Sequence, residues 1–372
     1  MTPRPLSGWF PASMFLLMAS APVTRSAEPP APGSLAAVAN VHLAVSPLVP
    51  RGESAASQLV LAFDSPGLSN LSVRLRSAAW GEPLTQAVDA APAGTRDLRF
   101  DGPRLTGPVE VTADFDLASQ RREFGPFTVR PPRAWTIYLT QHTHTDIGYT
   151  RPQTEILPEH LRYIDYALDY CDLTDALPDD ARFRWTCETA WAVREYVRTR
   201  PAQQIERLKR RIAEGRIEVC GLLLNMSEIA PESALAALVR PLRALKDDVG
   251  ITVQTAMQND VNGAGWCLPD YFHGLGLRYL SMGINQTRSI LPFDKPTCFW
   301  WESPSGKRVL AYRSDHYMTA NFWGLEKGRI EEVRPHVAKY LLSLEQRGYP
   351  FDRIGVQFSG YFTDNSPPST AA

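Results

Sequence analysis

Residues 135–150 read WTIYLTQHTHTDIGYT, an apolar strand that runs directly into polar side chains, and this stretch decides the fold. His142, His144 and Asp146 are spaced by two, so on an extended backbone they leave the same face. We expect them to converge at the C-terminal end of the strand, where Gly148 allows the chain to turn. Imidazole nitrogen and carboxylate oxygen are good ligands for Zn²⁺ or another divalent cation. The alternative that stays open is a hydrogen-bonded strand end without metal.

Strands alternate with helices from this stretch onward. Such alternation is typical of a parallel sheet or a β/α barrel, whose active sites lie at the carboxyl ends of the strands. Pro201 is expected to break the longest helical stretch, because proline cannot donate the helix hydrogen bond. The predicted strands are 135–140, 183–185, 217–223, 255–257, 279–282, 309–311 and 354–358. The predicted helices are 158–170, 191–213, 231–246 and 330–346.

Residues 28–133 have a different texture. Short alternating runs recur between Gly, Pro, Ser and Asn turns, which predicts a small β-sandwich domain with an accessory role. Pro131 and Pro132 mark its boundary, because consecutive prolines stiffen the chain and forbid helix. The predicted strands of this part are 41–45, 58–63, 71–75, 109–115 and 123–129.

The composition indicates an ordinary globular protein. A length of 372 residues favours two domains, and a hydrophobic content of 44% supplies ample core. A net charge of -1 gives no general attraction to nucleic acid or anionic membrane, so we expect neither as a partner. Five dispersed cysteines without a CxxC pair argue against a disulfide scaffold or a thiolate zinc site. The sequence allows no inference about a protein partner.

Residues 1–27 have the order of an export signal. Arg4 precedes an apolar stretch at 14–19, and small residues follow at 19–21 and 26–27. We therefore expect a secreted or periplasmic protein, with a disordered leader as the alternative.

Polar side chains also follow the other predicted strands. Because the carboxyl ends of parallel strands meet at one edge of a sheet, we expect a shared pocket there. Trp266 lies nearby in sequence, where its indole would stack on a sugar ring or pack in the core. The residues after these strands are Glu188, Asn225, Ser227, Glu228, Asp260, Asn262, Asn285, Asp315, His316, Tyr317, Tyr361, Asp364 and Asn365.

The chain from about residue 135 to 368 resembles the N-terminal catalytic domain of glycoside hydrolase family 38, the α-mannosidase family. The segment 142–149 resembles the signature H-x-H-x-D followed closely by G-[WY]. Residues 258–283, QNDVNGAGWCLPDYFHGLGLRYLSMG, and residues 358–365, FSGYFTDN, look like later segments of the same domain. The resemblance implies a seven-stranded β/α barrel over 134–372. Family members continue into a helical bundle and β-domains, so we expect a C-terminally truncated domain whose own activity stays open.

The resemblance also implies roles for single residues. His144 and Asp146 fall on zinc ligands, and His142 would orient them from behind, a role that we extend to Glu188. Two positions depart from the family pattern, because the carboxylate nucleophile falls on Ser227 and the last zinc-binding histidine on Val356. These departures indicate a divergent branch. The carboxylates that we then expect to carry the catalysis are Glu228, Asp260, Asp315 and Asp364. The residues that we expect to bind substrate are Asn225, Ser227, Asn262, Trp266, His316, Tyr317, Tyr361 and Asn365.

The function implied is a metal-dependent glycosidase, similar to α-mannosidases, that hydrolyses glycosidic bonds in glycans. The first alternative is a carbohydrate-binding homologue that lost its nucleophile, which the serine at position 227 favours. The second is another metallohydrolase with H-x-H at a first barrel strand, such as an amidohydrolase or deacetylase. Those enzymes need further histidines, and here only His316 follows a predicted strand.

Overall fold

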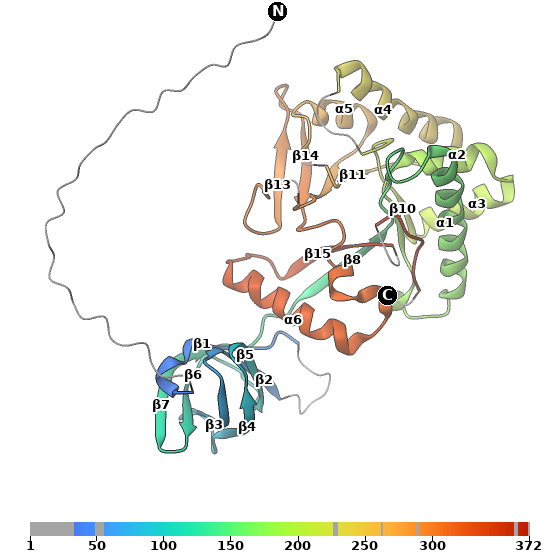
Figure 1. The fold of residues 1–372 in the computed structure, drawn as a ribbon. Helices are drawn as coiled ribbons and strands as arrows, with labels where there is room; N and C mark the ends of the chain where they lie inside the picture. Colours follow the sequence, from blue (N-terminus) through green and yellow to red (C-terminus); the bar gives the residue numbers. More distant parts are fainter. Residues whose placement is uncertain are drawn as a thin grey trace, which may run out of the picture. The chain divides into compact units, whose positions relative to one another are not determined.

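A computed structural model describes residues 33–48, 56–225, 230–261, 263–287, 290–360 and 364–370 (Figure 1). The predicted export signal lies outside these ranges. The chain divides into two compact units, of which the first comprises Met1–His42, Leu61–Leu98 and Glu110–Phe127. The second comprises Leu43–Val60, Arg99–Val109 and Thr128–Ala372. No helix among the described residues is long and apolar enough to cross a membrane.

The described residues of the N-terminal third form strands after a short 3-10 helix, η1 (Leu35–Ala37). The predicted strands are confirmed, but β4 (Leu84–Ala91) and β5 (Gly94–Gly102) were missed because polar residues such as Gln86 and Arg96 interrupt their apolar pattern. An accessory role and a boundary at residue 133 stay predictions. One sheet has the order β1 (Ala39–Val45), β2 (Ser57–Ser65), β5 (Gly94–Gly102). The other has the order β4 (Leu84–Ala91), β3 (Leu68–Arg76), β6 (Val109–Leu117), β7 (Gln120–Val129).

The described residues of the rest of the chain form two four-stranded sheets. The first is parallel and has the order β10 (Ile217–Val219), β9 (Trp185–Cys187), β8 (Thr136–His142), β15 (Arg353–Ser359). The second has the order β11 (Thr255–Asn259), β12 (Tyr279–Gly283), β14 (Arg308–Arg313), β13 (Thr297–Glu302), with β13 antiparallel at the edge.

A parallel bridge between Gly221 and Ala256 joins these two sheets on the side of β10 and β11. No sheet pairing joins β14 to β15 in the described part of the chain. The predicted parallel pairing is therefore confirmed and the fold is mixed α/β, whereas a closed barrel is not seen.

In the described residues of this part of the chain, helices lie between β8 and β9, between β11 and β12, and between β14 and β15, whereas β12, β13 and β14 follow one another without a helix (Figure 1). The break at Pro201 is confirmed, since α2 (Ala190–Thr199) ends just before it and α3 (Ala202–Ala213) begins just after it. The strand β13 was missed because its run of aromatic residues is not a typical sequence for an edge strand. The α-helices are α1 (Gln153–Leu173), α2 (Ala190–Thr199), α3 (Ala202–Ala213), α4 (Glu232–Ala244), α5 (Leu268–Leu275) and α6 (Ile330–Gln346). Short helical turns are η2 (Asp179–Ala181), η3 (Leu245–Val249), η4 (Asn321–Trp323) and η5 (Leu325–Lys327).

The alternation of side chains along β15 decides what this strand can contribute to a site. Ile354, Val356 and Phe358 are buried in an apolar cluster with residues of α6. Gln357 and Ser359 are buried on the other face, where Gln357 Nε2 lies 3.1 Å from Ser314 Oγ. The position of the family's last zinc-binding histidine, Val356, thus faces apolar packing and supplies no ligand.

Candidate metal centre

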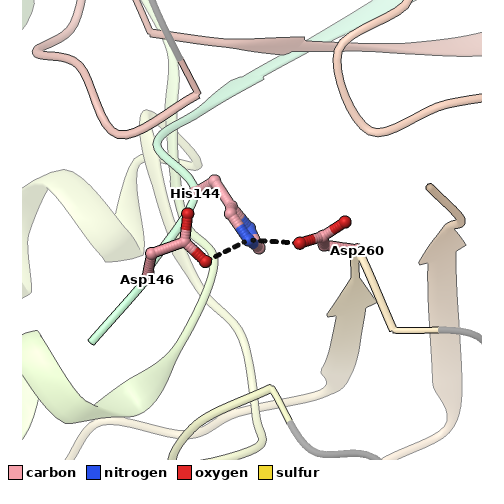
Figure 2. A group of neighbouring side chains, drawn as sticks. All are labelled: His144, Asp146 and Asp260. Atoms are coloured by element: carbon pink, nitrogen blue, oxygen red, sulfur yellow. Dashed lines mark ion pairs between the residues drawn. The ribbon is translucent and has the colours of Figure 1, made fainter. Parts of the chain in front are cut away.

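The centre is built around His144, whose side chain is only 2% exposed and follows the end of β8. His144 Nε2 lies 3.2 Å from Asp146 Oδ1 and 3.5 Å from Asp260 Oδ2 (Figure 2). One ligand atom from each of these residues lies within 4.8 Å of the other two. A loop after β8 and a loop after β11 thereby bring two carboxylates to the same imidazole nitrogen.

Glu188, directly after β9, is a buried carboxylate that holds the histidines from behind. Its Oε1 lies 2.8 Å from His144 Nδ1 and accepts from Asn225 Nδ2 at 2.5 Å. Its Oε2 lies 2.8 Å from His142 Nδ1 and accepts from Asn259 Nδ2 at 2.7 Å. Burial raises the pKa of Glu188, but His144 and the hydrogen bonds lower it more, so the net pKa is well below its usual range. The group is therefore ionised and acts only as an acceptor.

The charge state of His144 follows from these contacts. Because Glu188 accepts from Nδ1, the Nε2 atom faces Asp146 and Asp260. Burial lowers the pKa of His144, but Glu188, Asp146 and Asp260 raise it more, and it ends well above its ordinary value. Two carboxylate oxygens repel a bare nitrogen lone pair, so a positive charge belongs between them. That charge is either a proton on Nε2 or a metal cation.

The residues present fit a divalent cation. Asp260 Oδ1 is buried and no described residue hydrogen-bonds it. This carboxylate oxygen is therefore available to a cation or to a bound molecule. One imidazole and two carboxylates form the three-residue set of an open zinc site, in which substrate or water completes the coordination. His144 and Asp146 were predicted as ligands, whereas Asp260 was predicted as a catalytic carboxylate.

Asp146 is clamped by its own loop and by the chain near residue 365. Asn365 Nδ2 donates to Asp146 Oδ2 at 2.6 Å, and the Asp146 backbone N–H donates to Asn365 Oδ1 at 2.8 Å. Tyr149 Oη donates to Asp146 Oδ1. Burial raises the pKa of Asp146, but His144 and these hydrogen bonds outweigh it and the net pKa is lowered. Asn365 therefore orients the Asp146 carboxylate, and its expected contact with substrate stays a prediction.

Gly283, the last residue of β12, fixes the position of Asp260. Asp260 has a left-handed φ of 66°, and its N–H donates to the Gly283 carbonyl at 2.9 Å. A Cβ built on Gly283 would lie 2.7 Å from Tyr317 Cα and 2.8 Å from Asn259 Oδ1. Only glycine fits between these neighbours. Hydrogen bonding from His144 lowers the pKa of Asp260, so this carboxylate is also ionised.

Tyr317 and Asp364 lie beside the centre. The Tyr317 ring is 4.7 Å from the His144 ring, and its carbonyl is 2.9 Å from His142 Nε2. Tyr317 Oη donates to Asp364 Oδ2 at 2.9 Å, and the Asp364 carbonyl accepts from the His144 N–H at 2.6 Å. His316 stacks on Tyr317 with ring centroids 4.5 Å apart. The structure thus brings Asp364, Tyr317 and His316 to the centre.

Two predicted residues have other partners. Asp315 contacts Arg313 Nη1 at 3.3 Å and accepts from Tyr340 Oη, on α6, at 2.8 Å. Trp266 is 66% exposed, and its Nε1 donates to the Glu302 carbonyl at 2.7 Å. Their roles in catalysis and substrate binding stay predictions. The predicted residues that lie outside the described ranges are Ser227, Glu228, Asn262 and Tyr361.

Sequence reasoning missed Asn259, Gly283 and Tyr149 as parts of the centre. Asn259 directly precedes Asp260 at the end of a strand, and this position could have drawn attention to it. Tyr149 belongs to the quoted motif but carried no assigned role. Nothing in the sequence marks Gly283, because its role depends on contacts between distant segments.

Comparison with known proteins gives a family match over most of the second unit. Residues 134–360 match the family described as glycosyl hydrolases family 38 N-terminal domain. An α-mannosidase of Enterococcus faecalis V583 is similar in structure, with 18% identity, a TM-score of 0.49, and coverage of 63% of this chain and 25% of that one. A family 38 protein of Enterococcus faecalis has 15% identity and a TM-score of 0.41, with coverage of 60% and 23%. The chain thus spans about a quarter of the length of these structures. Comparison with the curated proteins gives no match.

Proposed function

Because this chain belongs to glycosyl hydrolase family 38, we propose that it is a metal-dependent glycoside hydrolase that acts on α-mannose or a related sugar. The observation that supports a metal is the convergence of His144, Asp146 and Asp260 on one point. A divalent cation bound there, zinc or a similar ion, would hold sugar hydroxyls and stabilise negative charge. The partner that this activity requires is a carbohydrate.

The chain's own carboxylates would carry the proton transfers. Hydrolysis of a glycosidic bond needs one carboxyl group that protonates the leaving oxygen and another that attacks or activates water. Asp364 adjoins the centre without being a ligand in the cluster, and its oxygens accept from Tyr317 Oη and Asn365 Nδ2. These two hydrogen bonds hold the Asp364 carboxylate beside the centre, within reach of a substrate bound there. We assign a proton-transferring role to Asp364 and the role of metal ligand to Asp260.

Turnover of a panel of aryl glycosides, headed by 4-nitrophenyl α-mannoside, tests the proposal. We expect wild-type protein to release 4-nitrophenol, and Asp260→Asn and Asp364→Asn each to lower kcat/KM at least about a hundredfold. Asp169→Asn is the matched control, because Asp169 is an exposed residue of α1 that pairs with Arg207 on α3. Activity that survives both substitutions, or no turnover by metal-loaded wild type, would contradict the assignment.

The second candidate is a carbohydrate-binding protein without hydrolysis. It is favoured by Ser227, which stands where the family has its carboxylate nucleophile. Calorimetry that shows sugar binding by wild type, together with no release of product from the whole panel, would select this candidate.

The proposal extends to architecture and location. The parallel orders β15-β8-β9-β10 and β11-β12-β14, with the bridge at Gly221, support a barrel of the family's β/α type.

The alternating strands of residues 28–133 support an accessory β-sandwich. The sequence of residues 1–27 supports export, so we propose a secreted or periplasmic enzyme.

A further inference from the structure

The hydrogen bonds of His316 fix its tautomer. The backbone N–H of Met318 points at His316 Nδ1 over a distance of 3.1 Å. A backbone N–H can only donate, so Nδ1 is an acceptor and carries no proton. Thr319 holds the turn in place, because its Oγ1 accepts from the His316 N–H at 3.1 Å and donates to the His316 carbonyl at 3.0 Å. The neutral ring must therefore carry its proton on Nε2.

Packing holds this ring against the centre. The side chain is buried between Tyr317, stacked at 4.5 Å, and Phe322, edge-on at 5.0 Å. Burial lowers the pKa of His316, which opposes a charged ring. The charged groups that act on the ring are Asp260, Asp364 and His144, all of which belong to the centre or adjoin it.

Several described donors at the centre already have acceptors. Tyr149 and Asn365 donate to Asp146, and Tyr317 donates to Asp364. A sugar hydroxyl can donate to a carboxylate, but its oxygen also needs a donor when it is removed from water. Among the described residues, nothing accepts the proton on His316 Nε2, so this N–H is available to a ligand.

We propose that His316 is a substrate-binding residue, held as the neutral Nε2–H tautomer so that it donates a hydrogen bond to a hydroxyl oxygen of an uncharged sugar at the metal centre. The inference rests on the proposed function, because it assumes that a sugar occupies the space beside Asp260 and Asp364. An uncharged sugar is the class that fits, since carboxylates surround the site and repel a uronic acid. His316 adds a donor without adding charge.

Nitrogen NMR of the full chain, with ¹⁵N-labelled histidine, tests the tautomer. The His316 signals are identified by their loss in His316→Gln. We expect an unprotonated Nδ1 and a protonated Nε2 at neutral pH. A protonated Nδ1, or a doubly protonated ring, would overturn the inference whether or not the chain is an enzyme.

Calorimetry with methyl α-mannoside tests the donor role. Glutamine places an amide N–H near the Nε2 position, so His316→Gln should bind within about threefold of wild type. Asparagine keeps the acceptor for the Met318 N–H but does not reach the sugar, so His316→Asn should bind about tenfold more weakly.

These outcomes distinguish failure of the donor role of His316 from failure of the proposed function. If wild type and His316→Asn bind equally, the donor role is wrong and the proposed function stands. If wild type binds no sugar, the proposed function fails and the donor role fails with it, whereas the tautomer is decided separately by NMR. Thermal melting shows whether each variant folds. If His316→Asn does not fold, a folded His316→Gln that binds sugar more than tenfold more weakly than wild type still overturns the inference.

Discussion

Glu188 Oε1 and His144 Nδ1 lie 2.8 Å apart, and both side chains are buried. This contact fixes the imidazole so that its Nε2 faces Asp146 and Asp260. A histidine that binds metal usually has its other nitrogen hydrogen-bonded in this way, which orients the ring and raises its basicity. The buried carboxylate therefore holds His144 in the orientation that our proposal of a metal ligand requires.

Substitution of Glu188 by glutamine should weaken metal binding. The amide keeps the shape but removes the negative charge, and its NH₂ group faces donors such as the Asn259 amide. We expect a loss in zinc affinity of about 10- to 100-fold, measured by calorimetric titration. Glu195→Gln is the control, because Glu195 on α2 pairs with Arg194 and Arg198 away from the centre. Equal affinities for the two variants would show that Glu188 does not support the ligand.

Substitution of Gly283 by alanine should lower the free energy of unfolding, because this glycine packs directly against Tyr317. The new Cβ would meet Tyr317 Cα and Cβ at 2.7 Å, and backbone cannot move aside as a flexible side chain would. Overpacking of this kind costs about 1–3 kcal/mol in the free energy of unfolding, measured by urea denaturation. Gly274→Ala in α5 is the matched control, because nothing lies within 4 Å of its Cβ. That change should leave stability equal or raise it by up to about 1 kcal/mol, since alanine favours helix. A Gly283→Ala protein as stable as wild type would contradict the packing argument.

His160 should make the stability of the chain depend on pH. This histidine is buried in α1 near Trp191, and burial lowers its pKa to about 4 from an ordinary value of 6.5. Between these values the unfolded chain binds a proton that the folded chain does not, so the free energy of unfolding falls as the pH is lowered through this window. The contribution is at most about 3.4 kcal/mol, at 1.36 kcal/mol per pKa unit.

Urea denaturation across this window, with His160→Gln as the comparison, isolates the effect. The glutamine variant should lose stability less steeply on acidification than wild type does. Parallel curves for the two proteins would mean that His160 is not held neutral by the fold.

Much of the second unit could be predicted from the sequence because its signals are local. Strands β8 and β15 and helix α6 follow from apolar periodicity and from turn residues at their ends. The spacing of His142, His144 and Asp146 likewise predicts convergence, and the structure brings these side chains together. The local sequence pattern was sufficient for features that a single segment of the chain determines.

The remaining features depend on contacts between distant segments. Asp315 and Asp364 both follow a strand, yet Asp315 meets Tyr340 on α6 whereas Asp364 meets Tyr317 beside the centre. Periodicity cannot tell these two aspartates apart, because their partners come from other parts of the chain. The same holds for Gly283, whose constraint arises only when Tyr317 packs on it.

The central claim is that His144 and its two carboxylate neighbours bind a divalent cation. Its most direct test is the metal content of the purified full chain, measured by mass spectrometry after zinc loading and desalting. We expect about one zinc ion per chain in wild type and in His336→Ala, whose histidine is exposed on α6, and none in His144→Ala. Zinc retained equally by His144→Ala, or absent from wild type, would contradict the claim.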